Sequence, residues 1–193
     1  MEERLVLASA SPRRARILSE LGIPFRVVVS RADESLRPGE DGAMAVERLA
    51  RAKATVVARA ETLPVLAADT EVICDGRILG KPASREDALA MVRLLSGRSH
   101  EVVTGVCVVA GGVMHSGVER TIVSIAPLSD AEREWYVSTG EPMDKAGGYN
   151  VGGRGAFLVE SVTGSPSNVE GLPVRLVLRL LREARVSVGP PFP

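Results

Sequence analysis

The sequence predicts an α/β fold in which helices flank a mixed β-sheet. Two observations indicate this class: helix and strand patterns alternate over the first part of the chain, and long β-type runs dominate after residue 98. The 193 residues are 45% hydrophobic, which is sufficient for a substantial core. Because no linker-like segment or internal repeat interrupts the chain, we expect a single domain over residues 1–193.

The first elements form a strand–helix–strand unit. The run "RLVLAS" predicts a strand, and Ser11 followed by Pro12 fits the N-cap and the first position of a helix over residues 12–21. Gly22 ends this helix, and "PFRVVVS" predicts the second strand. The polar loop "RADESLRPGEDG" then leads to a long helix over residues 43–60.

The stretch "PVLAADTEVICDGRILGKP" predicts a β-hairpin. Its parts are a strand over residues 64–74, a turn at Asp75–Gly76 and a returning strand over residues 77–79. Ser84 and Asp87 have the spacing of a capping box, so a helix is expected to begin there.

The second half of the chain begins with long paired strands that turn at Gly111–Gly112, followed by a helix with a capping box at Ser129 and Glu132. The glycine-rich stretch "GEPMDKAGGYNVGGRG" is expected to be too polar for the core. A strand in "AFLVESVTG" and a helix in "PVRLVLRLLREA" complete the predicted fold. The tail, residues 186–193, is expected to fray.

Composition argues against several classes of protein. Acidic and basic residues number 24 each and only 3% of residues are aromatic, so neither a basic stripe nor a stacking platform for nucleic acid is expected. No apolar run has the length of a membrane span or of a signal peptide. The two cysteines, Cys74 and Cys107, lie in apolar runs without metal-ligand spacing. We therefore expect a cytoplasmic protein with no nucleic-acid or membrane partner.

Positive charge is concentrated where the first helix begins. Arg13 and Arg14 lie in its first turn, although the positive end of the helix dipole disfavours cations there. Free N–H groups at a helix start bind phosphate, and Ser9 and Ser11 add hydroxyl donors. This pattern indicates an anion site, while solvated surface arginines remain an equally open interpretation.

Two carboxylates lie where a strand is expected to be buried. Asp69 is in the middle of "VLAADTEVI", and Glu71 points to the same face two residues later. An unpaired buried carboxylate costs several kcal/mol, so such a residue usually serves a cation, a metal or a reaction. The alternative is a structural ion pair with one of the arginines. Glu34, in the loop before the long helix, is either an ordinary loop acid or a metal ligand, and spacing alone favours the former.

Only three of the 24 basic residues are lysines: Lys53, Lys81 and Lys145. A chain that otherwise uses arginine places lysine where a compact charge is required. The segment "GRILGKP" is not a phosphate-binding P-loop, because its spacing is one residue short and Pro82 follows the lysine. Basic groups, hydroxyls and carboxylates in separate segments together indicate a Mg²⁺-dependent phosphate-ester or anhydride hydrolase.

Segments through most of the chain resemble the Maf family of nucleoside triphosphate pyrophosphatases. In order along the chain they are "LASASPRR", "VSRADESL", "RLARAKA", "AADTEVICDGRILGKP", "LSGRSHEVVTGV", "LSDAEREWYVSTGEPMDKAGGYNVGGRGA" and "SNVEGLPV". The resemblance implies an elongated α/β fold with two lobes around a central cleft, similar to Ham1 and inosine triphosphate pyrophosphatases. It also implies a homodimer that hydrolyses nucleoside triphosphates to the monophosphate and pyrophosphate with a divalent metal, Mg²⁺ or Mn²⁺.

The same resemblance assigns roles to individual residues. Asp69 matches the proton acceptor and a metal ligand, and Glu34 matches an acidic position near the metal, where Glu71 is a further candidate ligand. The positions that match the phosphate-facing positions of the family are Ser9, Arg13, Arg14, Lys53 and Lys81. The Ser11 hydroxyl at the helix start and the Lys145 ammonium are two further candidates for phosphate binding, by their residue type.

Base specificity is implied by three positions. Arg13 and Thr70 match the branch that hydrolyses dTTP and UTP, with modified pyrimidine nucleotides as further candidate substrates. That branch has glutamine in "YGIQG", whereas this chain has "YNVGG" and therefore Gly152 at that position. Asn150 is a candidate substitute. The alternatives are a different or relaxed base specificity, or a nucleotide-binding regulator of cell division and septum formation.

Overall fold

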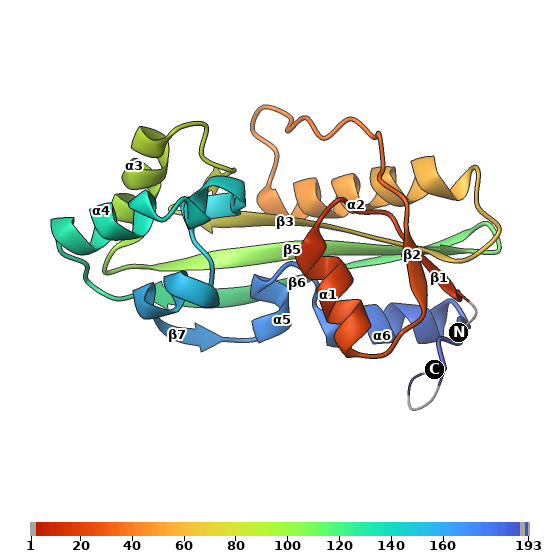
Figure 1. The fold of residues 1–193 in the computed structure, drawn as a ribbon. Coiled ribbons are helices and arrows are strands. Elements are labelled where there is room, and N and C mark those ends of the chain that lie inside the picture. Colours follow the sequence, from red (N-terminus) through yellow and green to blue (C-terminus); the bar gives the residue numbers. More distant parts are fainter. Residues whose placement is uncertain (1–2, 190–191, 193) are drawn as a thin grey trace. The chain divides into compact units, whose positions relative to one another are not determined.

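The computed structural model describes residues 3–189 and 192 and has the predicted α/β architecture, with helices on both faces of a mixed sheet (Figure 1). The strands are β1 (Leu5–Leu7), β2 (Phe25–Val27), β3 (Val65–Cys74), β4 (Arg77–Leu79), β5 (Ser99–Ala110), β6 (Val113–Ile125) and β7 (Val159–Thr163). The α-helices are α1 (Pro12–Glu20), α2 (Gly42–Ala58), α3 (Arg85–Leu95), α4 (Asp130–Ser138), α5 (Pro166–Val169) and α6 (Val174–Glu183). Three short 3₁₀ helices lie between α4 and β7: η1 (Glu141–Asp144), η2 (Ala146–Gly148) and η3 (Gly153–Leu158).

The sheet contains both parallel and antiparallel pairs. Its order is β2-β1-β3-β5-β6-β7, and β4 pairs with β3. β1 is parallel to β2 and β3, whereas β3–β4 and β6–β7 are antiparallel. The predicted turn at Asp75–Gly76 is confirmed: both residues have positive φ, 49° and 73°, as a two-residue hairpin turn requires.

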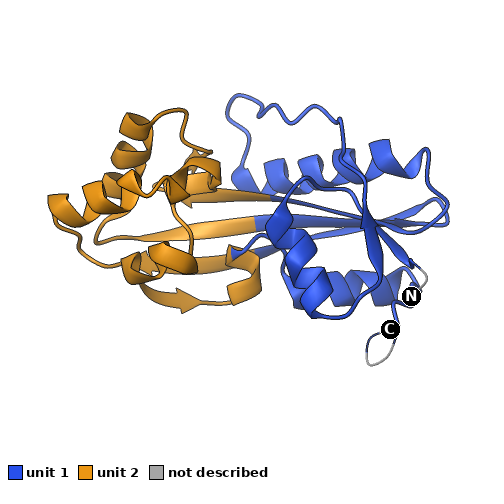
Figure 2. Cartoon of the chain, in the orientation of Figure 1, with its two compact units in different colours: residues 1–69, 104–119, 170–193 blue, residues 70–103, 120–169 orange. Residues whose placement is uncertain are grey.

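The chain folds into two compact units (Figure 2). Unit 1 comprises residues 1–69, 104–119 and 170–193, and unit 2 comprises residues 70–103 and 120–169. β3, β5 and β6 each contribute residues to both units, so three continuous strands connect them.

In unit 1, helices cover both faces of β1. Leu5 and Leu7 belong to an apolar cluster with α1 and α6, while Val6 and Ala8 belong to a second cluster with α2. This alternation explains why a short strand is buried at every position. Helix α2 lies so close to β5 that a Cβ at Gly105 would come within 2.3 Å of the Val46 carbonyl oxygen.

In unit 2, α3 and α4 pack with β-strands around a third apolar cluster, which includes Tyr136 and Tyr149. The capping box at Ser129 and Glu132 is confirmed. At the start of α3, the Ser84 hydroxyl accepts the Asp87 N–H as predicted, but the Asp87 carboxylate accepts the N–H of Ala83 instead of completing the box.

Ser11 is the N-cap residue of α1 as predicted, although its side chain makes no cap hydrogen bond.

Other sequence predictions are wrong in detail. The glycine-rich stretch after α4 was predicted to be excluded from the core, yet the structure buries Pro142, Gly147, Gly148, Tyr149 and Gly155 there. Its short 3₁₀ turns pack against α3, so packing compensates for a polar composition.

The ends of the last elements also differ from the prediction. The segment before β7 forms η3, which begins at Gly153, so the strand is shorter than "AFLVESVTG" suggests. The tail is not frayed at Val186 and Val188, which are buried in the core of unit 1. Residues 190, 191 and 193 of the predicted tail lie outside the described residues. Among the described helices, none combines the length and the apolar character needed to span a membrane.

Candidate active site

The centre of the candidate site in unit 1 is a buried ion pair. Lys53 on α2 and Asp69 in β3 are each 7% exposed, and the Lys53 Nζ lies 2.7 Å from Asp69 Oδ1. The same Nζ lies 2.8 Å from Oε2 of Glu34, whose side chain is 57% exposed. The structural alternative considered for Asp69 was an arginine partner, but the structure pairs it with a lysine. Lys53 thus brings together the two acidic residues predicted to serve the reaction.

One oxygen of the Asp69 carboxylate remains available. Asp69 Oδ2 is buried and has no hydrogen-bond partner among the described residues. Leaving a carboxylate oxygen unpaired in a buried position is unfavourable, because it loses water without gaining a donor. Such an atom favours a bound water, a cation or a substrate group at this position.

Strand pairing explains why the helix start and Asp69 lie in the same region of unit 1. β1 is parallel to β3, with Leu7 opposite Leu66, and the Ala8 N–H donates to the Leu66 carbonyl oxygen at 2.8 Å. Ser9 lies just beyond the carboxyl end of β1, and Asp69 lies in the middle of β3, three residues past Leu66. Ligands bind beyond the carboxyl ends of strands in open α/β sheets.

Arg14 is held in place by its neighbours. Its Nε donates to the Gly171 carbonyl oxygen at 2.8 Å, and its Nη1 donates to Ser9 Oγ at 3.2 Å. Burial lowers the pKa of Arg14, as does the charge of Arg13 to a smaller extent, while the charge of Asp69 acts in the opposite direction. An arginine remains protonated despite such a shift, so Arg14 is a fixed positive charge near Asp69.

Arg13 and Ser11 complete the helix start. Arg13 Nε is buried without a hydrogen-bond partner among the described residues, so one donor is available to a ligand. The Ser11 N–H donates to Ser9 Oγ at 3.1 Å, which fixes the turn before α1. The structure therefore brings Ser9, Arg14, Lys53, Asp69 and Glu34 together within unit 1.

The remaining candidates lie in unit 2. Thr70 and Glu71 follow Asp69 along β3, and Lys81 is exposed in the loop after β4. Lys145 forms an ion pair with Asp144 between η1 and η2. A backbone hydrogen bond of 3.0 Å from the Gly147 N–H to the Gly80 carbonyl oxygen joins the segments that carry the two lysines.

Gly152, the position expected to affect base specificity, is exposed and has a φ of −102°, which any residue adopts. An added Cβ would meet no atom within 4 Å. Neither backbone conformation nor space therefore requires glycine here, in contrast to Gly105. A longer side chain fits at this position.

The acidic residues fit a cation that takes part of its ligands from the substrate. No group of three or more His, Cys, Asp and Glu side chains that is suited to a metal occurs within residues 3–189 and 192. Asp69 and Glu34 provide two carboxylates, and Asp69 Oδ2 has no hydrogen-bond partner in the described part of the chain. Mg²⁺ is commonly bound by one or two carboxylates together with substrate phosphates and water, so this donor set fits it.

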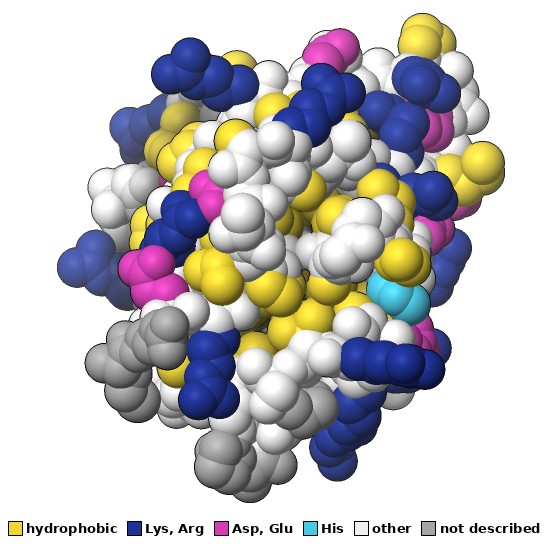
Figure 3. Space-filling model, turned by 90° about the vertical axis from the view of Figure 1, so that its right-hand side faces the viewer, with side chains coloured by type: hydrophobic (Ala, Val, Ile, Leu, Met, Phe, Trp, Pro, Cys, Tyr) yellow, Lys and Arg dark blue, Asp and Glu magenta, His cyan; other side chains and the backbone are white. Residues whose placement is uncertain are grey.

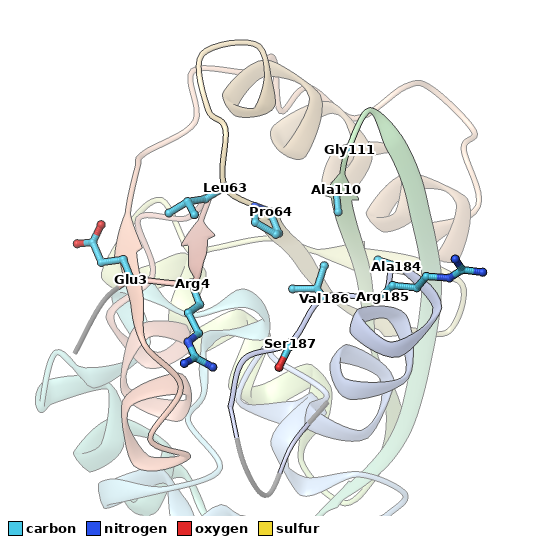
Figure 4. A pocket seen from close by; sticks show the side chains of 10 residues that line it. All are labelled: Glu3, Arg4, Leu63, Pro64, Ala110, Gly111, Ala184, Arg185, Val186 and Ser187. Atoms are coloured by element: carbon cyan, nitrogen blue, oxygen red, sulfur yellow. The ribbon is translucent and has the colours of Figure 1, made fainter.

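A separate hollow of about 480 Å³ lies at the far end of unit 1 and contains none of the candidate residues (Figure 4). Leu63, Pro64 and Val186 line its apolar part, while Glu3 and Arg185 point away from it. Figure 3 shows this end of the molecule, where hydrophobic side chains form the floor of the hollow and charges of both signs surround it. This face does not have the continuous basic surface of a nucleic-acid-binding protein.

The sequence did not reveal two sets of contacts, one in each unit. The Gly171 carbonyl that binds Arg14 lies in the "SNVEGLPV" segment, which had no assigned role. Glu141 also had none, although its carboxylate accepts hydrogen bonds from Asn150 and Gly155. The glycines at positions 153 and 155 are the only sequence signal near this second contact, and they do not identify the acidic partner.

Comparisons with known proteins found similar sequences over almost the whole chain. The dTTP/UTP pyrophosphatase of Symbiobacterium thermophilum is 48% identical over 182 residues, which cover 94% of each chain. The protein of the same name from Anaeromyxobacter sp. is 49% identical and covers 100% of this chain and 93% of its own. The one from Moorella thermoacetica is 50% identical, over 92% of this chain and 93% of its own. Among solved structures, the Ham1 protein of Staphylococcus aureus has a TM-score of 0.46 at 16% identity, over 63% of this chain and 71% of that chain.

The family model described as "Maf-like protein" matches residues 4–184, almost the whole chain. The match includes β1, the start of α1, the Lys53–Asp69 pair and the segment around Gly171. The chain belongs to the Maf family.

Proposed function

We propose that this protein is a metal-dependent nucleoside triphosphate pyrophosphatase that converts dTTP and UTP to the monophosphate and pyrophosphate. The observation that carries the proposal is the state of Asp69, whose Oδ1 is bound by Lys53 while its buried Oδ2 has no partner among the described residues. The names of the relatives, dTTP/UTP pyrophosphatase, support the choice of substrate.

The groups of unit 1 have distinct roles in the reaction. Arg14, fixed by Ser9 and Gly171, and Arg13 with its available Nε bind the triphosphate. Ser11 is a further hydroxyl donor at the helix start. Lys53 holds the Asp69 carboxylate in one orientation, so that Oδ2 is the atom that accepts a proton from water.

The chemistry is an in-line displacement at the α-phosphorus. The water oxygen forms a bond to this phosphorus, its proton passes to Asp69 Oδ2, and the bond to the bridging oxygen of the β-phosphate breaks. Pyrophosphate leaves with the electron pair of that bond. Asp69 and Glu34, with Glu71 as a further candidate ligand, would hold Mg²⁺ or Mn²⁺, which would neutralise negative charge on the phosphates. From unit 2, Lys81 and Lys145 are proposed to bind phosphate oxygens and Thr70 to contribute to substrate choice.

A hydrolysis panel tests the proposal. The purified protein with Mg²⁺ or Mn²⁺ receives each common nucleoside triphosphate and several modified pyrimidine nucleotides, and pyrophosphate is measured separately from orthophosphate. We expect pyrophosphate from dTTP and UTP above the other nucleotides. Orthophosphate release, or no release from any nucleotide, contradicts the proposal. Nucleotide binding without any release would instead favour the regulator of cell division.

A second candidate, the same reaction with relaxed base specificity, is favoured by Gly152. This position has no side chain to contact a base, although the surrounding space is open. Similar pyrophosphate release from purine and pyrimidine nucleotides would support this alternative over pyrimidine preference.

Replacement of Gly152 by Gln tests whether an amide at this position selects pyrimidines. Uracil and thymine present an N–H between two carbonyl oxygens, which an amide matches with both an acceptor and a donor. We expect the ratio of kcat/KM for UTP to that for ATP to rise by about tenfold, the effect of one added hydrogen bond. Gly152→Met, which has similar length and no amide, is the control. An equal rise with methionine would show that the amide is not responsible.

We also propose a cytoplasmic homodimer. Two free, buried cysteines, Cys74 and Cys107, support the compartment, because free thiols are typical of a reducing environment. Burial raises the pKa of the Cys107 thiol to about 12, so this thiol is unreactive. The homodimer follows from the family resemblance, and sedimentation of the purified protein tests it.

A further inference from the structure

Glu141, at the start of η1, is an acidic residue whose two oxygens both accept hydrogen bonds from one segment of unit 2. Oε1 accepts from the Asn150 side-chain Nδ2 at 2.8 Å, and Oε2 accepts from the Gly155 N–H at 3.1 Å. A carboxylate only accepts hydrogen bonds, so the Asn150 amide is oriented with its nitrogen toward Glu141. We call residues 141–155 the η1–η3 segment.

Two glycines of the η1–η3 segment lie where an added side chain would collide with its neighbours. Gly153 has a φ of 60°, and an added Cβ would lie 2.4 Å from Glu141 Oε1. At Gly155 an added Cβ would lie 2.1 Å from the Asn150 carbonyl oxygen. No side chain fits at either position without displacing its neighbours, so Gly153 allows the close approach of Glu141 and Gly155 allows the close approach of the Asn150 backbone.

Helix α4 holds the same segment from its other side. The buried Tyr136 hydroxyl oxygen accepts the Asn150 N–H at 3.0 Å, and Thr139 Oγ1 accepts the Glu141 N–H at 3.2 Å. Two contacts to α4 and two to Glu141 therefore determine the path of a segment that contains little regular secondary structure.

The η1–η3 segment carries one candidate phosphate-binding lysine and contacts the loop of another. Lys145 lies within it, and its N–H donates to the Pro142 carbonyl oxygen at 3.1 Å. Two residues later, the Gly147 N–H donates to the carbonyl oxygen of Gly80, which precedes Lys81. Displacement of the segment therefore changes the surroundings of both lysines.

We infer that Glu141 is a positioning residue which fixes the η1–η3 segment so that Lys145 and Lys81 bind the polyphosphate of the substrate. It acts through Asn150, Gly155 and Gly147 and does not itself touch the substrate. This inference rests on the proposed function, because it assigns the two lysines to a nucleoside triphosphate.

The test compares Glu141→Ala with Glu141→Gln. The alanine variant removes both acceptors, and we expect KM for UTP to rise by about tenfold or more while kcat changes by less than about threefold, because hydrogen bonds to a charged group are lost away from the reacting atoms. The glutamine variant is expected to remain within about threefold of wild type. Its carbonyl oxygen accepts from Gly155, and its NH₂ donates to the Asn150 side-chain oxygen after that amide turns over.

Glu134→Ala is the matched control, since Glu134 is an exposed glutamate on the neighbouring helix α4. The second readout is the Kd of α,β-methylene UTP, which binds without being cleaved at the α–β bridge. An alanine variant with unchanged KM and Kd overturns the inference even where its melting temperature falls, since the role of Glu141 would then be structural only. A fall in kcat with unchanged KM also overturns it.

The analogue separates this inference from the proposed function. If wild type releases no pyrophosphate but binds the analogue, and Glu141→Ala weakens that binding about tenfold, the proposed function fails and the role of Glu141 stands. If wild type is active and the alanine variant retains its affinity, the proposed function stands and the role of Glu141 fails.

Discussion

Replacement of Asp69 by Asn is expected to lower pyrophosphate release from UTP by about 10² to 10⁴-fold, the usual effect of losing a general base. The amide has the shape of the carboxylate, and its oxygen can still accept the hydrogen bond from Lys53, which is 2.7 Å from Oδ1 in the wild type. It cannot accept a proton from water at the position of Oδ2. Steady-state kcat measured by pyrophosphate release, together with the melting temperature, checks the prediction.

Asp75→Asn is a suitable control for this variant. Asp75 is exposed in the β3–β4 turn and has a φ of 49°, a conformation that asparagine tolerates well. We expect kcat of the control to stay close to that of wild type. Activity of Asp69→Asn near the wild-type level would remove Asp69 from its assigned role, provided that the variant binds α,β-methylene UTP normally.

Replacement of Lys53 by Met is expected to have the largest effect on stability. It leaves the buried Asp69 carboxylate without its cation, and breaking a buried ion pair by removing one partner costs about 3–5 kcal/mol. The free energy of unfolding, measured by urea denaturation, is therefore expected to fall by about this amount. Pyrophosphate release is expected to be lost as well, because the orientation of the Asp69 carboxylate depends on the Lys53 ammonium.

The double variant Lys53→Met with Asp69→Asn separates the lost attraction from the cost of an unpaired buried charge. The neutral asparagine no longer needs a cation, so the double variant is expected to be more stable than Lys53→Met alone. Lys81→Met, at an exposed position, is expected to change the free energy of unfolding by less than about 0.5 kcal/mol. A double variant no more stable than the single one would show that Lys53 contributes through packing and not through Asp69.

The prediction of the fold succeeded where local rules determine the structure. The alternating apolar pattern predicts β1, α1 and β2 in order, and the positive φ of Asp75 and Gly76 follows from the turn type that their sequence favours. The capping box at Ser129 and Glu132 is a contact within four residues, so it is visible in the sequence. These features depend on neighbours along the chain.

The prediction failed where distant segments meet. Glycine and polar residues suggested an exposed loop after α4, but the contacts of Glu141 with Asn150 and Gly155 and the packing on α3 bury much of it. Val186 and Val188 belong to a tail that was predicted to fray, yet both side chains are buried in the core of unit 1. A segment is buried when distant parts of the fold present a surface that it can pack against. The local sequence pattern carries no information about that surface.

In the candidate site, too, some features were predictable from the sequence and others were not. The sequence by itself determined that Asp69 is a carboxylate within a buried strand, that arginines and serines gather at the start of α1, and that the chain resembles the Maf family. Only the tertiary structure decided that Lys53, 16 residues away on α2, is the partner of Asp69 and that Gly171, 157 residues from Arg14, fixes its guanidinium. The physical reason is that a residue's chemistry is a local property, whereas the partner of a buried charge is whichever opposite group the folded chain brings within hydrogen-bond distance.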